Sequence, residues 1–211
     1  MRLSITKNSR ILAAFAIVCT AIVGIINETT KARIESQEQQ QLLNILHSII
    51  APERLNNEMY QDCLTITDTE LGTLIPQTVY LAKYNDKPVA AAITNIAPDG
   101  YNGNIELIVA INYDGTISGV RALKHQETPG LGDKIELRKS NWVTNFIGKK
   151  IESETDSQWK VRKDGGMFDQ FTGATITPRA VVKSVKKTAL YFAKNKQKLF
   201  TQTSTCRGNN D

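Results

Sequence analysis

The amino-acid sequence predicts an α+β protein, with a single N-terminal transmembrane helix followed by a domain in which helices flank a central antiparallel sheet. Three observations favour this class. An uncharged apolar run lies near the N-terminus, strand-like segments joined by turn residues occupy the middle of the chain, and helical patterns lie before and after them. The length of 211 residues and the hydrophobic content of 41% are typical of one folded domain with a small addition.

The first helix is expected over residues 9–29. Its centre, from Ile11 to Ile26, carries no charge and approaches the roughly 20 residues that span a bilayer. Only basic charges precede it and mixed charges follow, so the positive-inside rule predicts residues 1–8 as a cytoplasmic stub, with the rest of the chain across the membrane. A cleaved signal peptide and a buried core helix are the alternatives. Because no A-x-A cleavage site follows the run and its flanking charges are asymmetric, we expect an uncleaved anchor.

Residues 30–75 are expected to form a helical and then irregular segment close to the membrane. Lys31 to Ile50 gathers its apolar residues toward one side, as an amphipathic helix does, and Pro52 ends the pattern. A tract rich in Asn, Thr and Asp continues to about Leu74, and no strand is predicted in it.

The predicted domain covers residues 76–200. Turn signals at Asn85-Asp86 and Asp114-Gly115 each separate two strand-like runs, which is typical of hairpins. The four expected strands are Val79–Lys83, Val89–Ile96, Ile105–Asn112 and Ile117–Leu123. A short helix is expected at Asn141–Ile147 and a long one at Pro178–Lys198, and residues 201–211 are expected to form a flexible tail.

Charge and composition exclude several classes of function. The net charge is +5, but Arg2, Lys7 and Arg10 precede any acidic residue, and the rest of the chain is nearly balanced, which argues against nucleic-acid binding. Two histidines and three widely spaced cysteines provide no ligand set for zinc, an iron–sulfur cluster or covalent haem, so no metal site is expected. P-loop and Rossmann phosphate-binding motifs are also missing from the sequence.

Cys63 and Cys206 both fall in the part of the chain expected to be exported. An oxidising compartment permits a disulfide between them, but two unpaired thiols are equally compatible with the sequence, since it does not give the Cα distance that decides.

Residues Asp169–Arg179 form the first segment that carries chemistry. They predict a compact turn that leads into a helix, with Thr177 placed to cap it and Pro178 at its first position. Gly173 and Ala174 allow close approach of a ligand, and the free N–H groups of a helix start favour an anion such as phosphate. The alternative is a well-capped amphipathic helix whose many lysines form a solvated face.

Residues His125–Gly132 form the second such segment. Pro129 and Gly130 predict a tight loop that presents its backbone and the side chain of Leu131, with polar residues able to hydrogen-bond a planar ring. The alternative is a structural turn in which His125 and Glu127 pair at the surface.

Together, the segments DQFTGATITPR and ETPGLG resemble the FMN-binding domain family of membrane redox complexes, over roughly Ala97 to Ala193. The resemblance implies that FMN is joined through its phosphate to the hydroxyl of Thr175 by a separate flavin transferase, which recognises Asp169. It also implies that Thr175 is the acceptor of a modification and not a catalytic residue. The other cofactor-binding residues that it implies are Thr172, Gly173, Ala174, Thr177, Glu127, Thr128 and Leu131.

The whole chain further resembles the G-subunit family of the Rnf-type (Rsx) electron transport complex, in its short stub, its one anchor and the segments APDGYNG and GLGDKIELR. The related C-subunit family of the sodium-pumping NADH:quinone reductase is usually longer. This resemblance implies an electron carrier that couples electron flow to ion translocation, in the inner membrane with its bulk in the periplasm. Its implied partners are the other Rnf/Rsx subunits, the flavin transferase and the lipid bilayer. A membrane-anchored reductase of a small substrate and a flavin-free scaffold are the alternatives.

Overall fold

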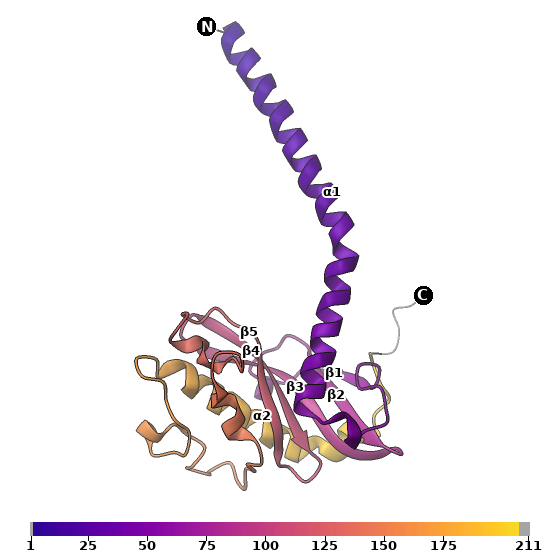
Figure 1. Cartoon of the computed structure of the whole chain (residues 1–211), viewed down its shortest axis with the longest axis vertical. Helices are drawn as coiled ribbons and strands as arrows, with labels where there is room; N and C mark the ends of the chain where they lie inside the picture. The colour runs from indigo at the N-terminus through magenta and orange to yellow at the C-terminus, as the bar shows by residue number, and fades with distance from the viewer. Residues whose placement is uncertain (1, 207–211) are drawn as a thin grey trace. The chain divides into compact units, whose positions relative to one another are not determined.

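The computed structural model describes residues 2–206 and divides into two compact units, Met1–Asn44 and Ile45–Asp211 (Figure 1). The first unit consists of a single helix, α1, which runs over Arg2–Ile49 and contributes its last residues to the second unit. The helix expected over residues 9–29 and the helical pattern expected from Lys31 to Ile50 form one continuous helix. The helix continues because no proline interrupts the ladder, and the Thr29 and Thr30 hydroxyls bond back to the carbonyl oxygens of Ile25 and Ile26 within it.

Helix α1 contains one stretch that is long and apolar enough to cross a membrane, with a mean hydropathy of 2.3. Its large apolar side chains are exposed, as in Leu12 and Phe15 at 70% and 71%. An apolar helix with no protein packed on it is suited to lipid rather than to water. The N-terminal apolar helix predicted from the sequence is confirmed as a candidate membrane span.

The second unit is built on a five-stranded antiparallel sheet with the strand order β1-β2-β3-β4-β5. The strands are β1 (Cys63–Ile66), β2 (Gln77–Tyr84), β3 (Lys87–Gly100), β4 (Gly103–Asn112) and β5 (Ile117–Lys124). The four predicted strands and the α+β class are confirmed. Strand β1 was missed because it has only four residues inside a polar tract. Asn85 and Asp86 have φ angles of 49° and 59°, the left-handed conformation that a two-residue hairpin turn requires.

Helix α2 (Ile176–Thr201) packs on one face of the sheet, as Figure 1 shows. Val181, Val185 and Phe192 point into this core, where they join Leu107 and Val109 of β4. These side chains are completely buried, and the period of 3.6 residues in the sequence predicted them as the inner side of the helix.

The other face of the sheet receives the last residues of α1. Gly119 leaves room for them, because a Cβ atom at this position would lie 2.8 Å from Cβ of Ile49. The Ser118 hydroxyl donates to the carbonyl of Ile49 at 2.5 Å, and the Arg121 guanidinium donates to the carbonyl of Ser48 at 3.2 Å. A cation at the last carbonyls of a helix complements its dipole. Burial lowers the pKa of Arg121.

Short 3₁₀ helices and loops connect β5 to α2. The predicted helix at Asn141–Ile147 is present as the 3₁₀ helix η4 (Asn141–Phe146). The remaining 3₁₀ helices are η1 (Pro52–Arg54), η2 (Thr69–Leu71), η3 (Gly132–Ile135) and η5 (Arg162–Asp164). Trp142 packs edge-on against Phe146 and Phe171, with ring centroids 5.4 and 5.1 Å apart. This aromatic contact holds the segment before α2 against the core.

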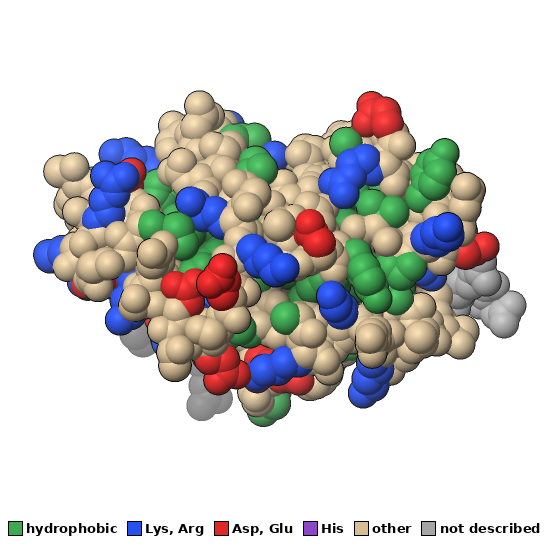
Figure 2. Space-filling model, turned by 90° about the horizontal axis from the view of Figure 1, so that it is seen from below, with side chains coloured by type: hydrophobic (Ala, Val, Ile, Leu, Met, Phe, Trp, Pro, Cys, Tyr) green, Lys and Arg blue, Asp and Glu red, His purple; other side chains and the backbone are tan. Residues whose placement is uncertain are grey.

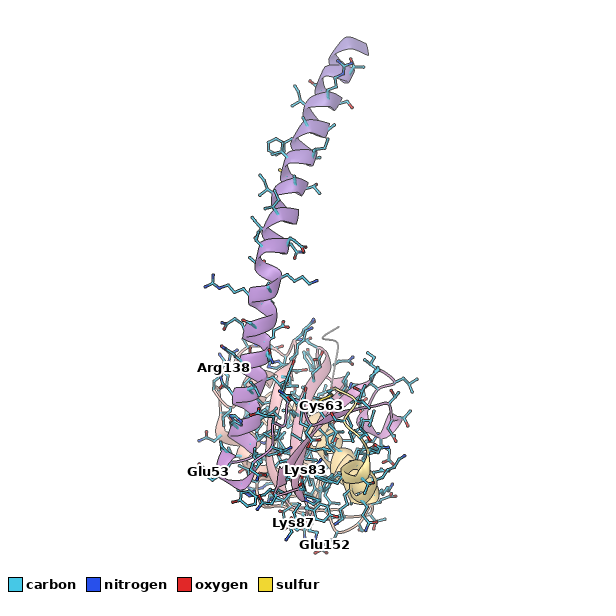
Figure 3. The ribbon with its side chains drawn as sticks, turned by 90° about the vertical axis from the view of Figure 1, so that its right-hand side faces the viewer. Glu53, Cys63, Lys83, Lys87, Arg138 and Glu152 are labelled. Atoms are coloured by element: carbon cyan, nitrogen blue, oxygen red, sulfur yellow. A yellow bond between two sulfur atoms is a disulfide. The ribbon has the colours of Figure 1, made fainter. Side chains whose placement is uncertain are left out.

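Each edge of the sheet receives backbone hydrogen bonds from another segment at one end. At β1, the Thr205 N–H donates to the carbonyl of Cys63 at 2.9 Å, and a disulfide joins Cys63 to Cys206 with their Cα atoms 5.4 Å apart (Cys63 is labelled in Figure 3). At β5, the Ile117 N–H donates to the carbonyl of Lys149 at 2.8 Å. Of the expected tail, residue 201 ends α2, residues 204–206 are bonded to β1, and residues 207–211 lie outside the described residues.

Candidate functional site

The two segments that the sequence singled out meet at one cavity of about 260 Å³. The loop after β5 forms one wall, and the turn at the start of α2 forms the other. The cavity is lined by Tyr101, Glu127, Thr128, Leu131, Gly132, Gly173, Ala174, Thr175, Ile176 and Thr177. Seven of the eight residues expected to bind the cofactor are therefore brought together, and the eighth, Thr172, is exposed and not among the lining residues.

Thr175 occupies the position immediately before α2 and is half-buried in the cavity wall. Its side chain does not cap the helix, and no other described residue hydrogen-bonds its hydroxyl. The first N–H groups of a helix have no partner within the helix, so Thr175 lies where an anion would be stabilised. This arrangement places an available hydroxyl beside the first N–H donors of the helix.

The predicted start of this helix is wrong by two residues. Thr177 was expected to cap it and Pro178 to occupy its first position, but α2 begins at Ile176. The cause is local, because Thr175 already has helical angles, with φ −84° and ψ −26°. Thr177 therefore lies inside the first turn, where it is completely buried, and its hydroxyl does not cap the helix.

The Thr177 hydroxyl instead donates to Oε2 of Glu127 at 2.5 Å. Oε1 of Glu127 accepts from the backbone N–H of Asn102 at 3.2 Å, and the residue is only 5% exposed. The surface pair of His125 with Glu127 expected as an alternative is thus wrong. His125 hydrogen-bonds through Nε2 to Glu136 at 3.0 Å, and its Nδ1 accepts from the Glu127 backbone N–H at 3.1 Å. The Arg138 guanidinium and then His125 lower the pKa of Glu136.

The loop that carries Glu127 is closed by its own backbone. The N–H groups of Leu131 and Gly132 both donate to the carbonyl of Thr128 at 3.1 Å. A Cβ atom at Gly132 would lie 2.6 Å from Oε2 of Glu127, so no larger residue fits there unchanged. On the opposite wall, Gly173 has a φ of +80°, and a Cβ there would meet only the Leu131 side chain at 3.5 Å. The two walls therefore approach each other through glycines.

An apolar rim surrounds the cavity. Tyr101, Leu131 and Ile176 are 63%, 41% and 46% exposed, and they come from three separate parts of the chain. Leu131 was predicted, whereas Tyr101, Ile176 and the donor Asn102 were not. The sequence did carry a signal for the first of these, since Tyr101 lies between Gly100 and Gly103 at the turn of a long hairpin.

Asp169, the residue expected to be recognised by a transferase, lies just before this turn. Its carboxylate is exposed and pairs with Nε of Arg162 at 3.1 Å. Its backbone carbonyl accepts from the indole N–H of Trp142 at 2.7 Å, which fixes the chain at this point. The aromatic core thus anchors the backbone, and the acidic group remains accessible.

The lysines and arginines of α2 are not simply a solvated face. Arg179 pairs with Asp164 at 2.5 Å, Lys183 pairs with Asp99, and Lys194 contacts Glu70 and Glu154 at 3.0 and 2.7 Å. Hydrogen bonds from Arg179 lower the pKa of Asp164. Figure 2 shows basic and acidic side chains interspersed on the face that it presents. A surface of this kind gives no extended positive field for nucleic acid.

The cavity suits FMN on three grounds that come from its own residues. A free threonine hydroxyl and unpaired helix N–H groups match a phosphate, and the apolar rim with glycines on both walls matches a flat ring. The buried carboxylate and the loop backbone supply polar contacts. The part of the chain that the structure describes contains no group of three or more metal-ligating side chains.

Comparison with known proteins also indicates an FMN-binding domain that follows an N-terminal region. The family model of the FMN-binding domain matches residues 100–189, and that of the RnfG N-terminal region matches residues 1–49. A protein of Shewanella piezotolerans is 52% identical over 100% of both chains, and one of Shewanella oneidensis is 53% identical over 97% of both. A protein of Vibrio cholerae is 51% identical over 99% of this chain and 100% of its own length. All three relatives are named as the G subunit of the ion-translocating oxidoreductase complex.

Proposed function

The chain belongs to the G-subunit family of ion-translocating oxidoreductase (Rnf-type) complexes, and we propose that it carries electrons within such a complex through an FMN joined to Thr175. The relatives' shared name supplies the complex, and the FMN-binding domain supplies the cofactor class. The attachment itself is inferred from the cavity. The single observation that supports it best is the unbonded, half-buried hydroxyl of Thr175 at an uncapped helix start.

The proposed bond is a phosphoester between the FMN phosphate and Oγ1 of Thr175. At that position the phosphate is next to the first N–H groups of α2, which favour an anion electrostatically. The other threonine hydroxyl of this wall, that of Thr177, is engaged by Glu127. The geometry therefore favours Thr175 over Thr177 as the attachment point.

A separate flavin transferase is the proposed source of the modification, with Asp169 as its recognition residue. Asp169 is exposed, its backbone is fixed by Trp142, and it precedes Thr175 by six residues.

Bound FMN supplies reversible electron transfer, and the protein positions the ring and sets its surroundings. Thr175 tethers the phosphate, the apolar rim excludes water from one side of the ring, and the loop after β5 provides polar contacts. We assign no catalytic acid, base or nucleophile to the chain, which acts as a relay between partner subunits. The core of this flavin domain is proposed to cover residues 97–193 within 76–200.

The proposed location is the inner membrane, with residues 1–8 in the cytoplasm, residues 9–29 in the bilayer and the flavin domain in the periplasm. Basic charges before the apolar run and mixed charges after it support this orientation. The disulfide between Cys63 and Cys206 is also in keeping with an oxidising compartment.

The decisive experiment co-expresses the full chain with a flavin transferase and examines it on a denaturing gel under ultraviolet light. We expect a fluorescent band whose intact mass exceeds that of the bare chain by FMN minus water. Thr175→Ala is expected to abolish the fluorescence, and Thr201→Ala, an exposed threonine at the other end of α2, is expected to retain it. A dark wild-type band in the presence of active transferase contradicts the proposal.

A further inference from the structure

We propose that the buried carboxylate of Glu127 is a fixed negative charge at the cavity that lowers the reduction potential of the flavin, and that Thr177 and Asn102 hold it there. This inference rests on the proposed function, because it concerns the cofactor expected in the cavity. It assigns Glu127 the role of a positioning and tuning residue, distinct from the attachment at Thr175.

The two carboxyl oxygens of Glu127 each have a hydrogen-bond partner. Oε2 accepts from the Thr177 hydroxyl at 2.5 Å, and Oε1 accepts from the Asn102 backbone N–H at 3.2 Å. Both oxygens therefore act as acceptors, and each donor comes from a different element. Although the side chain is almost completely buried, it lines the cavity.

Neighbouring glycines leave the room that this carboxylate occupies. A Cβ atom at Gly100 would lie 2.9 Å from Oε1 of Glu127, and one at Gly132 would lie 2.6 Å from Oε2. The carboxylate thus fills the space that two missing side chains leave, between the β3–β4 turn and the loop after β5. Its position is set by packing as well as by hydrogen bonds.

The charge of Glu127 is not balanced by a nearby cation. The neighbouring His125 directs its Nε2 to Glu136, and no ion pair joins Glu127 to any basic side chain that the structure describes. A buried and unneutralised anion has a long-range effect, because the surrounding protein screens it less than water does. Reduction makes a flavin more electron-rich, so a fixed anion beside it opposes reduction.

The test measures the potential of the flavin in the full-length, flavin-loaded chain in detergent by spectroelectrochemical titration. We expect Glu127→Gln to raise the midpoint potential. At the potential where the wild type is half reduced, the ratio of reduced to oxidised flavin should increase at least about tenfold, because one charge that lines the cavity lies no more than about 12 Å from the flavin, at an effective dielectric constant of about 20. The matched control is Glu106→Gln, a half-buried carboxyl on β4 that does not line the cavity, and it should titrate as the wild type does.

A second pair of variants tests the support of the carboxylate. Thr177→Val removes the donor to Oε2, so the carboxylate is no longer held at the cavity by this hydrogen bond and the potential should rise in the same direction. Thr177→Ser keeps the donor and should retain the wild-type potential. A purely structural role for Thr177 predicts no change in potential for either variant.

Three outcomes overturn the inference. The first is a loaded Glu127→Gln chain with the wild-type potential, and the second is equal behaviour of Thr177→Ser and Thr177→Val. The third is failure of both Glu127→Gln and Thr177→Val to take up flavin while Glu106→Gln is loaded, which assigns the pair to folding alone. A wild-type chain without covalent flavin refutes the proposed function instead, so the two failures are distinguishable.

Discussion

At the scale of single residues, the cavity depends on glycines, which have no Cβ atom. Gly132 is buried against both Glu127 and Thr177, and a Cβ atom would lie 2.6 Å from the carboxylate and 2.8 Å from the hydroxyl. Gly132→Ala is therefore expected to destabilise the domain by about 1–3 kcal/mol, the usual cost of overpacking, and to reduce flavin loading. Chemical denaturation and gel fluorescence measure the two effects.

A matched control for this substitution lies two residues earlier. Gly130 has a φ of +77° with nothing near its Cβ position, and asparagine tolerates this conformation better than other residues with a side chain. Gly130→Asn should leave both stability and loading close to wild type. If Gly132→Ala is equally mild, the packing around Glu127 is looser than the structure indicates.

Asp114 gives a second prediction at this scale. The backbone N–H of Thr116 and then its hydroxyl, at 2.9 and 2.7 Å, lower the pKa of the Asp114 carboxyl. A carboxyl whose pKa is lowered by folding stabilises the folded state above its unfolded pKa of about 3.9, and this contribution is lost as the pH falls through the lower, folded pKa. On acidification to about pH 3, the wild type should therefore lose more thermal stability than Asp114→Asn does. Parallel pH profiles of the two proteins contradict the prediction.

The same residues show what a sequence can and cannot reveal. Asp114-Gly115 was identified as a hairpin turn because turn chemistry is local. The partnership of Glu127 with Thr177 joins residues 50 positions apart, and no local pattern encodes it. The sequence therefore indicated which residues surround the cavity but not which of them hydrogen-bond to one another.

At the scale of elements, the strongest cross-link joins the C-terminal segment to β1. The disulfide between Cys63 and Cys206 closes a loop with a sequence separation of 143 residues. Cys206→Ser should lower the free energy of unfolding by about 4 kcal/mol, because a long loop is released in the unfolded chain. Denaturant unfolding measures this loss, and reducing agent should destabilise the wild type to the same extent.

Cys19 provides the control for this experiment. It is a free cysteine in the apolar part of α1, so Cys19→Ser should not change the unfolding of the domain or its response to reducing agent. If Cys206→Ser unfolds as the wild type does, the C-terminal segment contributes little to stability, and its hydrogen bonds to β1 are too weak to matter.

Element boundaries were predictable only where one physical signal dominates. Strand-like runs separated by turn residues located β2 to β5, and helical periodicity located α2. The start of α2 was misplaced because a proline at the first helical position is a statistical preference, whereas the backbone angles of Thr175 decide where the helix begins. Strand β1 was missed because its four residues lie inside a polar tract, and one of its partners, the C-terminal segment, lies far away in the sequence.

At the scale of the whole molecule, the end of α1 belongs to the folded domain. Leu46, Ile49 and Ile50 are at most 3% exposed and lie in the unit Ile45–Asp211. A chain shortened to residues 45–211 should therefore fold, whereas one that begins at residue 51 should lose about 5 kcal/mol or more of stability from three missing core side chains. Circular dichroism and thermal unfolding of the two shortened chains test this. Equal stability of both contradicts the assignment of these residues to the core.

The presence of an N-terminal apolar helix followed by an α+β domain could be predicted from the sequence. The apolar run predicted the candidate membrane span, and the spacing of strands and helices predicted the α+β class. The continuity of α1 from Arg2 to Ile49 was not predicted. The composition changes from uniformly apolar to amphipathic, and such a change suggests the end of one helix even though the backbone here stays helical. The docking of its end depends on Gly119, a residue that no helical pattern includes.

The C-terminal segment that bonds to the edge of β1 also determines when, during synthesis of the chain, that edge can be closed. A ribosome completes β1 some 140 residues before it adds Cys206, so the edge of the sheet remains open for most of the synthesis of the chain. Open edges are where chains pair wrongly with their neighbours. A chain that lacks the last described residues therefore retains both an open strand edge at β1 and an unpaired thiol at Cys63.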